Sequence, residues 1–318
     1  MNKLIAIVAG EPNSINSEII AKSLKLKKRK KNIFIIGNYL ILKKQFNIIN
    51  QKIKILKINS IDEINKKYLN ILDVPLKFKS PFSPNKADSK KYVLKCLDLA
   101  HYLSYSNKIK GFINLSVNKT IFNNKYLGVT EYLAAKNNTK GREVMMIYNK
   151  KLSVVPLTTH IEIKDVVKKI KTSLIKKKIV SLNKYYIQLF KRKPMIVILG
   201  LNPHNSENRK NSVENKIIKP STLDLKKSGI NILGPFPADT IFSNQKKFKY
   251  DLVVGMYHDQ VLAPFKALYG YDAINITLGL NYLRASPDHG TAQDIIGQNK
   301  AEPQSLISAI NFLRKIND

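Results

Sequence analysis

Short apolar runs alternate with amphipathic stretches along the whole chain. The runs that predict strands lie at residues 4–10, 32–38, 54–58, 111–117, 143–149, 152–158, 194–201, 251–257 and 273–280. Apolar residues at helical spacing predict helices at 17–26, 90–104, 130–138, 164–178, 220–229 and 303–315. Several strand runs are apolar throughout, as expected for strands that are covered on both faces. This alternation favours an α/β fold with largely parallel sheets.

Length and hydropathy limit the class of protein. A chain of 318 residues with 44% hydrophobic residues can form two domains or one large α/β unit. No apolar run approaches the roughly 20 residues that a membrane-spanning helix needs. The opening segment LIAIVA is short and no cleavage-site pattern follows it, so it reads as a first strand. We therefore expect a cytoplasmic protein without a membrane partner.

The formal net charge of +33 raises the question of nucleic-acid binding. The lysines are spread through the chain together with many asparagines and isoleucines, which indicates a general compositional bias. Dense basic runs at 25–31 and 168–178 have no zinc finger or aromatic nucleic-acid motif beside them, and the second has the spacing of a solvated helix face. We expect no specific nucleic-acid partner. The single cysteine, Cys96, excludes an internal disulfide and is expected in the core.

Histidines provide the candidate chemistry. His160, His204 and His258 each follow the carboxyl end of a predicted strand, where open α/β sheets place their ligand-binding groups. Imidazole binds zinc and other transition metals, and three protein ligands with an open position form a catalytic arrangement. Any one of these histidines alone would be read as an ordinary loop residue. Because three occur in equivalent places, a shared metal site is about as probable as three unrelated loop histidines. His101 falls within a predicted helix and is expected to be structural, whereas His289 lies in a polar loop.

The sequence motifs around these histidines form a recognisable set. They are GLNPH at 200–204, GPFPADTIF at 234–242, MYHDQ at 256–260, NITLGL at 275–280 and SPDHGTA at 286–292. Shorter words, VNK at 117–119, GxTE at 128–131 and TTH at 158–160, occur in matching order. Together they resemble the 4-hydroxythreonine-4-phosphate dehydrogenase family over nearly the whole chain, most densely from 196 to 297.

The resemblance implies a fold similar to isocitrate and isopropylmalate dehydrogenases. Two α/β/α domains would be separated by a cleft, in a homodimer whose active site uses both subunits. We expect a first, discontinuous domain at 1–128 plus 268–318, which carries the NAD segment. The second domain is expected at 129–267, with the metal histidines and the dimer side.

The resemblance also assigns roles to individual residues. Metal ligands would be His160, His204 and His258, the last supplied by the partner subunit. Substrate-binding residues would be Thr130, Lys266, Asn275 and Arg284, and NAD contacts would come from Asp288, His289 and Gly290. Lys266 is also a candidate catalytic residue. Asp239 and Asp259 lie beside the histidines in sequence and are candidates for proton transfer, although a role in fixing a loop is equally compatible with their positions.

The implied reaction is the NAD-dependent oxidation and decarboxylation of 4-phosphooxy-L-threonine to 3-amino-2-oxopropyl phosphate in pyridoxal phosphate (vitamin B6) biosynthesis. A divalent metal would lower the pKa of the substrate hydroxyl and polarise the developing carbonyl while hydride passes to NAD. Zinc suits three imidazoles best, with magnesium or cobalt as alternatives. NADP is the alternative to NAD. Lys266 and Arg284 suit the phosphate or carboxylate of the substrate.

The chain departs from the family pattern in several places. Val129 stands where the family's GHTE word has a histidine that contacts the substrate, and valine cannot donate a hydrogen bond. The loop at 205–208 reads NSEN and has lost the family's glycine. Such changes are compatible with drift at constant function. They are also compatible with a paralogous NAD-dependent dehydrogenase of another 4-phosphorylated hydroxy acid, a phosphothreonate or phosphoerythronate.

Overall fold

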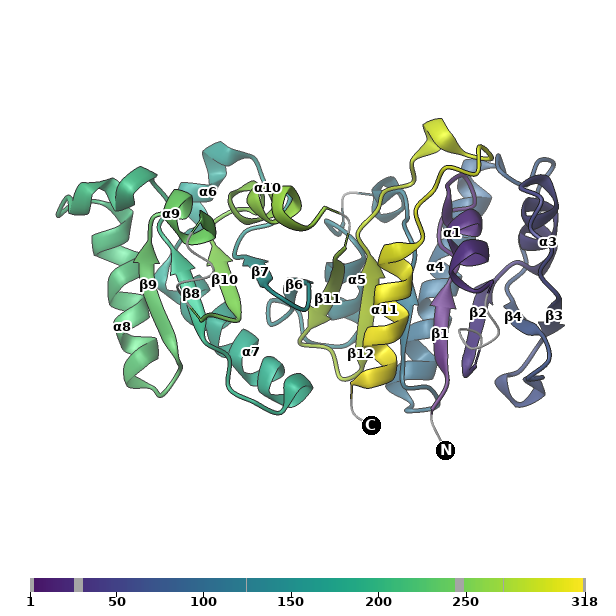
Figure 1. Ribbon diagram of the computed structural model, residues 1–318, viewed down its shortest axis with the longest axis horizontal. Helices are drawn as coiled ribbons and strands as arrows, with labels where there is room; N and C mark the ends of the chain where they lie inside the picture. The colour runs from purple at the N-terminus through teal and green to yellow at the C-terminus, as the bar shows by residue number, and fades with distance from the viewer. Residues whose placement is uncertain (1–2, 26–30, 124, 244–248, 271, 317–318) are drawn as a thin grey trace. The chain divides into compact units, whose positions relative to one another are not determined.

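The computed structural model describes residues 3–25, 31–123, 125–243, 249–270 and 272–316. Most of the basic run at 25–31 lies outside these residues. The chain divides into two compact units, Met1–Asn137 with Asn281–Asp318, and Asn138–Leu280. In each unit, helices pack beside a central sheet (Figure 1). The predicted α/β fold class is thus confirmed.

The first unit contains a parallel sheet in the order β3-β4-β2-β1-β5-β12. Its strands are β1 (Ile5–Val8), β2 (Ile33–Gly37), β3 (Ile55–Ile58), β4 (Leu69–Asp73), β5 (Gly111–Asn114) and β12 (Leu283–Pro287). Its helices are α1 (Asn16–Ser23), α3 (Tyr39–Ile48), α4 (Lys86–Tyr105), α5 (Val129–Lys136) and α11 (Gln304–Lys315). All residues of β1, β2 and β5 are buried, which explains their uniformly apolar runs.

The second unit contains a mixed sheet in the order β11-β6-β7-β10-β8-β9. Its strands are β6 (Val144–Tyr148), β7 (Ser153–Pro156), β8 (Ile196–Leu199), β9 (Ile232–Phe236), β10 (Leu252–Gly255) and β11 (Ile274–Leu278). Its helices are α6 (Ile163–Lys169), α7 (Thr172–Phe190), α8 (Lys219–Lys227), α9 (Ala238–Ser243) and α10 (His258–Tyr269). Strands β7, β10, β8 and β9 are parallel neighbours, so their carboxyl ends share one edge.

Along the chain, the two compact units are divided at 137/138 and 280/281. Helix α5 belongs to the first unit because Tyr132 donates to Asp98 Oδ1 of α4 at 2.5 Å. Strand β11 belongs to the second because it pairs with β6.

The helix expected at 164–178 is wrong as a single element. It is two helices, α6 and α7, separated at Ile170 and Lys171, which have extended backbones. Ile170 is 1% exposed, so the break turns its side chain into the core.

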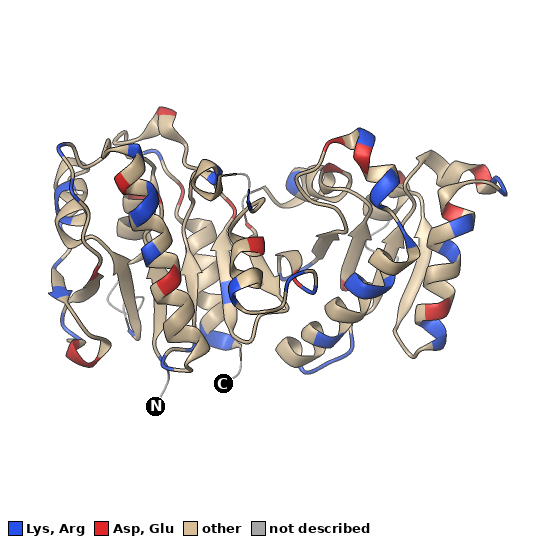
Figure 2. Cartoon of the chain, turned by 180° about the vertical axis from the view of Figure 1, so that it is seen from behind, with Lys and Arg blue, Asp and Glu red and all other residues tan. Residues whose placement is uncertain are grey.

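Cationic residues are distributed over the helices of both units. Figure 2 shows Lys and Arg on most helices, with Asp and Glu interspersed. The ion pairs along α7 and its neighbours follow this pattern, as between Lys176 and Asp224 at 2.7 Å. This spread matches the general compositional bias inferred from the sequence.

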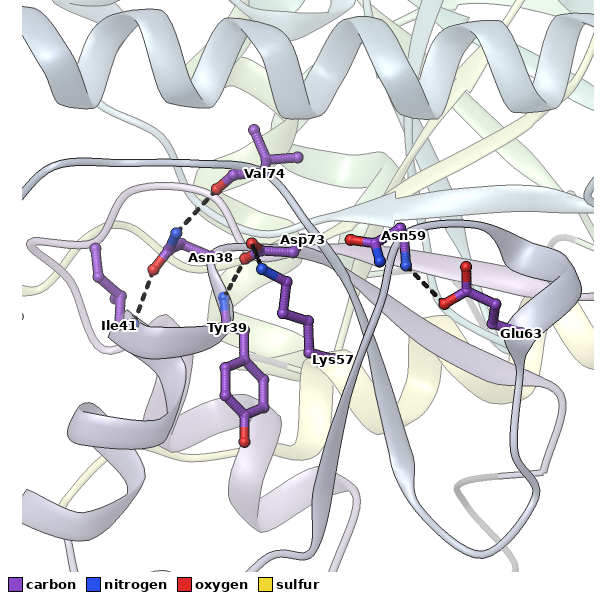
Figure 3. Close-up of polar contacts among 8 residues, drawn as sticks. All are labelled: Asn38, Tyr39, Ile41, Lys57, Asn59, Glu63, Asp73 and Val74. Carbon is purple, nitrogen blue, oxygen red and sulfur yellow. Dashed lines mark hydrogen bonds and ion pairs between the residues drawn. The ribbon is translucent and has the colours of Figure 1, made fainter.

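Polar contacts fix the start of α3 at the carboxyl ends of β2 and β4 (Figure 3). Asn38 accepts from Ile41 N at 2.9 Å and donates to Val74 O at 3.1 Å. The carboxylate of Asp73 accepts from Tyr39 N at 2.7 Å and pairs with Lys57 at 2.9 Å. Because a carboxylate at a helix N-terminus satisfies free amide groups, these contacts stabilise the helix and its junction with the sheet.

Candidate active site

The three histidines follow three adjacent parallel strands of the second unit. His160 follows β7, His258 follows β10 and His204 follows β8. In the register of these strands Pro156 lies opposite Gly255, and Val254 lies opposite Ile198. The three segments therefore leave the sheet at the same edge (Figure 1), as their sequence positions predicted.

The structure brings His160 and His258 together. Their ring centroids are 5.7 Å apart. Thr158 links the two segments, because both its amide and its hydroxyl donate to Met256 O, at 3.2 and 2.7 Å. A metal about 2 Å from a nitrogen of each ring would hold the centroids roughly 5 Å apart, so this pair fits a shared ion.

His258 is the first residue of α10 rather than a loop residue. Its Nδ1 is hydrogen-bonded to Asp259 Oδ1 at 2.6 Å. A carboxylate at one ring nitrogen orients the imidazole and leaves Nε2 for a ligand. Asp259 thus occupies a position that suits ring orientation.

His204 lies in the 3-10 turn Pro203–Asn208, in a left-handed backbone conformation with φ 48°. Its Nε2 is 4.0 Å from Asp239 Oδ2, and both side chains are largely exposed. Across the described residues of one chain, no three His, Cys, Asp or Glu side chains lie close enough together to bind one metal ion. One chain thus brings two of the three predicted ligands together, with the third on the same edge.

Lys266 and Asn275 are the substrate residues predicted in this unit. Lys266 lies in the last turn of α10 and is exposed. Asn275 lies in β11, and its Oδ1 is buried without a hydrogen-bond partner among the described residues. A buried carbonyl oxygen without a donor is costly, so Asn275 presents an acceptor suited to a ligand hydroxyl or amino group.

In the first unit, the structure brings Arg284 and Thr130 together. Arg284 lies in β12, is 3% exposed, and donates from Nη1 to Thr130 Oγ1 at 3.3 Å. Its Nε donates to Asn114 Oδ1 at 2.7 Å. Burial lowers the pKa of the guanidinium to about 10, with Tyr282 and Glu131 opposing that shift, so the group is cationic at neutral pH. Asn114, the last residue of β5, lies within the strand predicted at 111–117 and was not among the predicted site residues.

Val129 lies immediately before Thr130. It is the first residue of α5, follows the cap residue Gly128, and is 8% exposed. Its apolar side chain stands one residue from a hydroxyl that accepts from Arg284. Valine in place of the family's histidine therefore stands next in sequence to Thr130, which bonds to Arg284.

The predicted NAD segment begins where β12 ends. Asp288 N donates to Ser305 Oγ at 2.8 Å, which fixes the segment against α11. His289 Nδ1 lies 2.9 Å from Gly290 O, and because a carbonyl only accepts, this nitrogen carries the proton. Burial lowers the pKa of His289, against the opposing effects of Gly290 and Asp288. In the neutral ring Nε2 is then an acceptor, and it is buried without a partner among the described residues.

The sequence of the chain is similar to that of a well-defined family. The family model described as "Pyridoxal phosphate biosynthetic protein PdxA" matches residues 29–313. A 4-hydroxythreonine-4-phosphate dehydrogenase of Aquifex aeolicus is 36% identical over 100% of this chain and 99% of its own. An enzyme of the same name from a Sulfurihydrogenibium species is 38% identical over 97% of this chain and 96% of its own. A D-threonate 4-phosphate dehydrogenase of Pectobacterium atrosepticum is 30% identical over 99% of this chain and 100% of its own.

Solved structures agree with these relatives. A crystal structure of 4-hydroxythreonine-4-phosphate dehydrogenase from Klebsiella pneumoniae superposes with a TM-score of 0.87 at 29% identity, covering 98% of each chain. A terephthalate 1,2-cis-dihydrodiol dehydrogenase from Burkholderia xenovorans has a TM-score of 0.63 at 22% identity, over 99% of this chain and 98% of its own, and shares the fold. The likeness in fold therefore extends over the full length of the chain.

Proposed function

The chain belongs to the pyridoxal phosphate biosynthetic protein PdxA family, and from this premise we propose that it oxidises and decarboxylates 4-phosphooxy-L-threonine with NAD. The product would be 3-amino-2-oxopropyl phosphate, a precursor in pyridoxal phosphate biosynthesis. The observation that carries the proposal is the full-length similarity, at 36% and 38% identity, to two relatives with the dehydrogenase name.

His160, His204 and His258 would hold the divalent metal. The spacing of His160 and His258, 5.7 Å between ring centroids, supports this assignment, and neutral imidazoles favour zinc, with magnesium or cobalt as alternatives. When bound, the metal would act as a Lewis acid toward the hydroxyl that is oxidised. The 5.7 Å spacing lies within one chain and favours that chain's own His258, whereas the family resemblance implies His258 of the partner subunit; mixing H160A and H258A chains distinguishes the two. The expected cytoplasmic location remains a prediction.

Arg284 and Thr130 would bind the anionic part of the substrate. Arg284 is buried and cationic, and a buried guanidinium is favoured when a phosphate or carboxylate compensates its charge. Thr130 and Asn114 fix two of its N–H groups, which sets the direction of the remaining ones. Lys266 and Asn275 would bind further polar groups of the same substrate.

Proton transfer would involve Asp239 or Asp259, with Lys266 as a third candidate. Asp259 bonds to His258 Nδ1, and Asp239 lies 4.0 Å from His204 Nε2. These contacts support a role in orienting the two imidazoles as well as a role in proton transfer.

NAD would bind beside Asp288, His289 and Gly290, with NADP as the alternative. The buried acceptor Nε2 of His289 supports this placement, because a cofactor hydroxyl or amide could donate to it.

A second candidate function is the oxidation of a phosphothreonate or phosphoerythronate. The buried apolar Val129 beside Thr130 favours it, since valine cannot make the polar substrate contact that the family's histidine makes at this position. Similarity to a relative named D-threonate 4-phosphate dehydrogenase, at 30% identity, supports it more weakly.

Initial rates of NADH formation with each phosphorylated acid, in the presence of Zn²⁺, test the two functions. We expect the highest kcat/KM with 4-phosphooxy-L-threonine. A higher value with the threonate would establish the second function instead. We also expect Val129→His to raise kcat/KM for the threonine phosphate severalfold if the missing contact matters.

A further inference from the structure

The loop that carries His204 has an unusual backbone. Five consecutive residues with side chains, His204 to Asn208, have φ angles of 48°, 54°, 52°, 51° and 58°. We call residues 204–208 the left-handed turn. Asparagine tolerates this conformation, but Ser206 and Glu207 have no such preference. Contacts from elsewhere must therefore maintain the turn.

The buried carboxylate of Glu214 provides those contacts. Glu214 is 1% exposed and lies at the start of the π-helix Glu214–Ile218. Its Oε1 accepts from Leu201 N at 2.9 Å and from Asn202 N at 2.8 Å, and Asn202 Nδ2 contacts both oxygens. Its Oε2 accepts from Ser206 Oγ at 2.9 Å. The carboxylate thus contacts residues on both sides of His204.

A second contact places the loop relative to His258. Gln260 Nε2 donates to Gly200 O at 2.7 Å, and its Oε1 accepts from Met256 N at 2.7 Å. One side chain therefore joins the segment before His204 to the segment before His258. A Cβ on Gly200 would meet Asn205 Oδ1, so a larger residue there would displace the Asn205 side chain.

We propose that Glu214 is a positioning residue for metal binding: its carboxylate fixes the left-handed turn so that the His204 imidazole is oriented before the ion arrives. This inference rests on the proposed function, in which His204 is a metal ligand. Residues that orient a metal ligand from outside the coordination sphere commonly change metal affinity by roughly 10- to 100-fold when they are replaced.

The test measures Co²⁺ binding to the purified full-length protein by the visible absorption of the bound ion. Glu214→Gln keeps the size of the side chain but leaves one oxygen acceptor in place of two. Asp251→Asn is the matched control, because Asp251 also accepts from a backbone amide, Met195 N at 2.9 Å, but precedes β10 at the opposite end of the strands. Hydrogen exchange of the peptide 200–208 without metal reports the turn itself.

We expect E214Q to weaken Co²⁺ binding roughly 10-fold or more and to speed exchange in 200–208, and D251N to do neither. Adding Glu207→Gly to E214Q should recover part of the affinity, because glycine adopts a positive φ without steric cost. Binding is compared where every variant is fully folded, because a loss of global stability alone then leaves the Co²⁺ affinity unchanged.

Two results contradict the inference, and they differ in what else they affect. If H204A abolishes Co²⁺ binding while E214Q binds as the wild type does, Glu214 has no positioning role and the metal assignment stands. If the wild type shows no Co²⁺ spectrum, or H204A leaves it unchanged, both the positioning role and the proposed metal site are wrong.

Discussion

At the scale of single residues, two of the predicted ligands lie in strained backbone positions. His160 and His204 have φ angles of 45° and 48°, which cost an L-residue roughly 1–2 kcal/mol each. Histidine is among the residues that adopt this region more often than most. A strained backbone conformation persists only where surrounding contacts hold it in place. Such conformations are concentrated at functional sites.

Replacing Glu207 by glycine tests the strain in the turn. We expect the free energy of unfolding to rise by about 0.5–1 kcal/mol, the gain in backbone conformation less the entropy that glycine loses. The ion pair of Glu207 with Arg209 is exposed and contributes little. Denaturant unfolding measures the change, with Asn205→Gly as a control that should gain less. A destabilised E207G protein would show that the turn is not strained.

Arg284→Lys tests the proposed anion site. Lysine keeps the charge but loses the planar fork that donates to Asn114 and Thr130, so we expect kcat/KM to fall roughly 10- to 100-fold. The effect should appear mainly in KM. Steady-state kinetics measure it, with Arg314→Lys, on α11, as the control that should change little. Equal kinetics for R284K and the wild type would remove Arg284 from the substrate site.

At the scale of elements, the sequence predicts best where one pattern dominates. All nine predicted strands are present, and apart from β3 their apolar residues are mostly buried in the sheets. Strand β4 was missed because it contains Asn70, which is buried and bonds to the backbone of Asn65. Strand β9 was missed because Gly234 and Pro235 read as loop residues, and Pro264 obscured helix α10.

Only the placement of the candidate residues could be predicted. The position of each histidine after a strand predicted that the three lie at one edge of the sheet, since parallel strands end at one edge. The Glu214 contacts with Asn202 and Ser206 could not be predicted, because they depend on how a π-helix returns to the loop. The pairing of Arg284 with Asn114, 170 residues away, likewise requires the folded sheet.

Asp251 connects three elements and gives a pH-dependent prediction. It accepts two bonds from Arg192, after α7, and one from Met195 N, before β8. Burial would raise the pKa of this carboxyl, but the bonds from Arg192 and Met195 outweigh it and lower the pKa below the usual 3.8.

A carboxyl whose pKa is depressed on folding stabilises the protein above its unfolded pKa, and this contribution disappears as the pH falls through the folded pKa. We expect Asp251→Asn to cost about 1–3 kcal/mol at neutral pH. The difference from the wild type should shrink below pH 3.8. Unfolding free energies across this range measure it, and a difference independent of pH would contradict the assignment.

At the scale of the whole molecule, the central question is whether one chain supplies all three imidazoles. Mixing H160A and H258A chains answers it. If His258 comes from the partner subunit, a mixed dimer has one intact site, and re-associated protein should recover about a quarter of wild-type activity in a symmetric dimer. If each chain supplies its own His160 and His258, every site carries one substitution and no activity returns. NADH formation after re-association distinguishes the two.

The most direct test of the proposed reaction follows the carboxyl carbon of the substrate. Purified protein with Zn²⁺ and NAD would receive 4-phosphooxy-L-threonine labelled in its carboxyl group, and both NADH and labelled carbon dioxide would be measured. We predict equimolar formation of the two, abolished in H258A. NADH without labelled carbon dioxide, or neither product under these conditions, would contradict the proposed reaction.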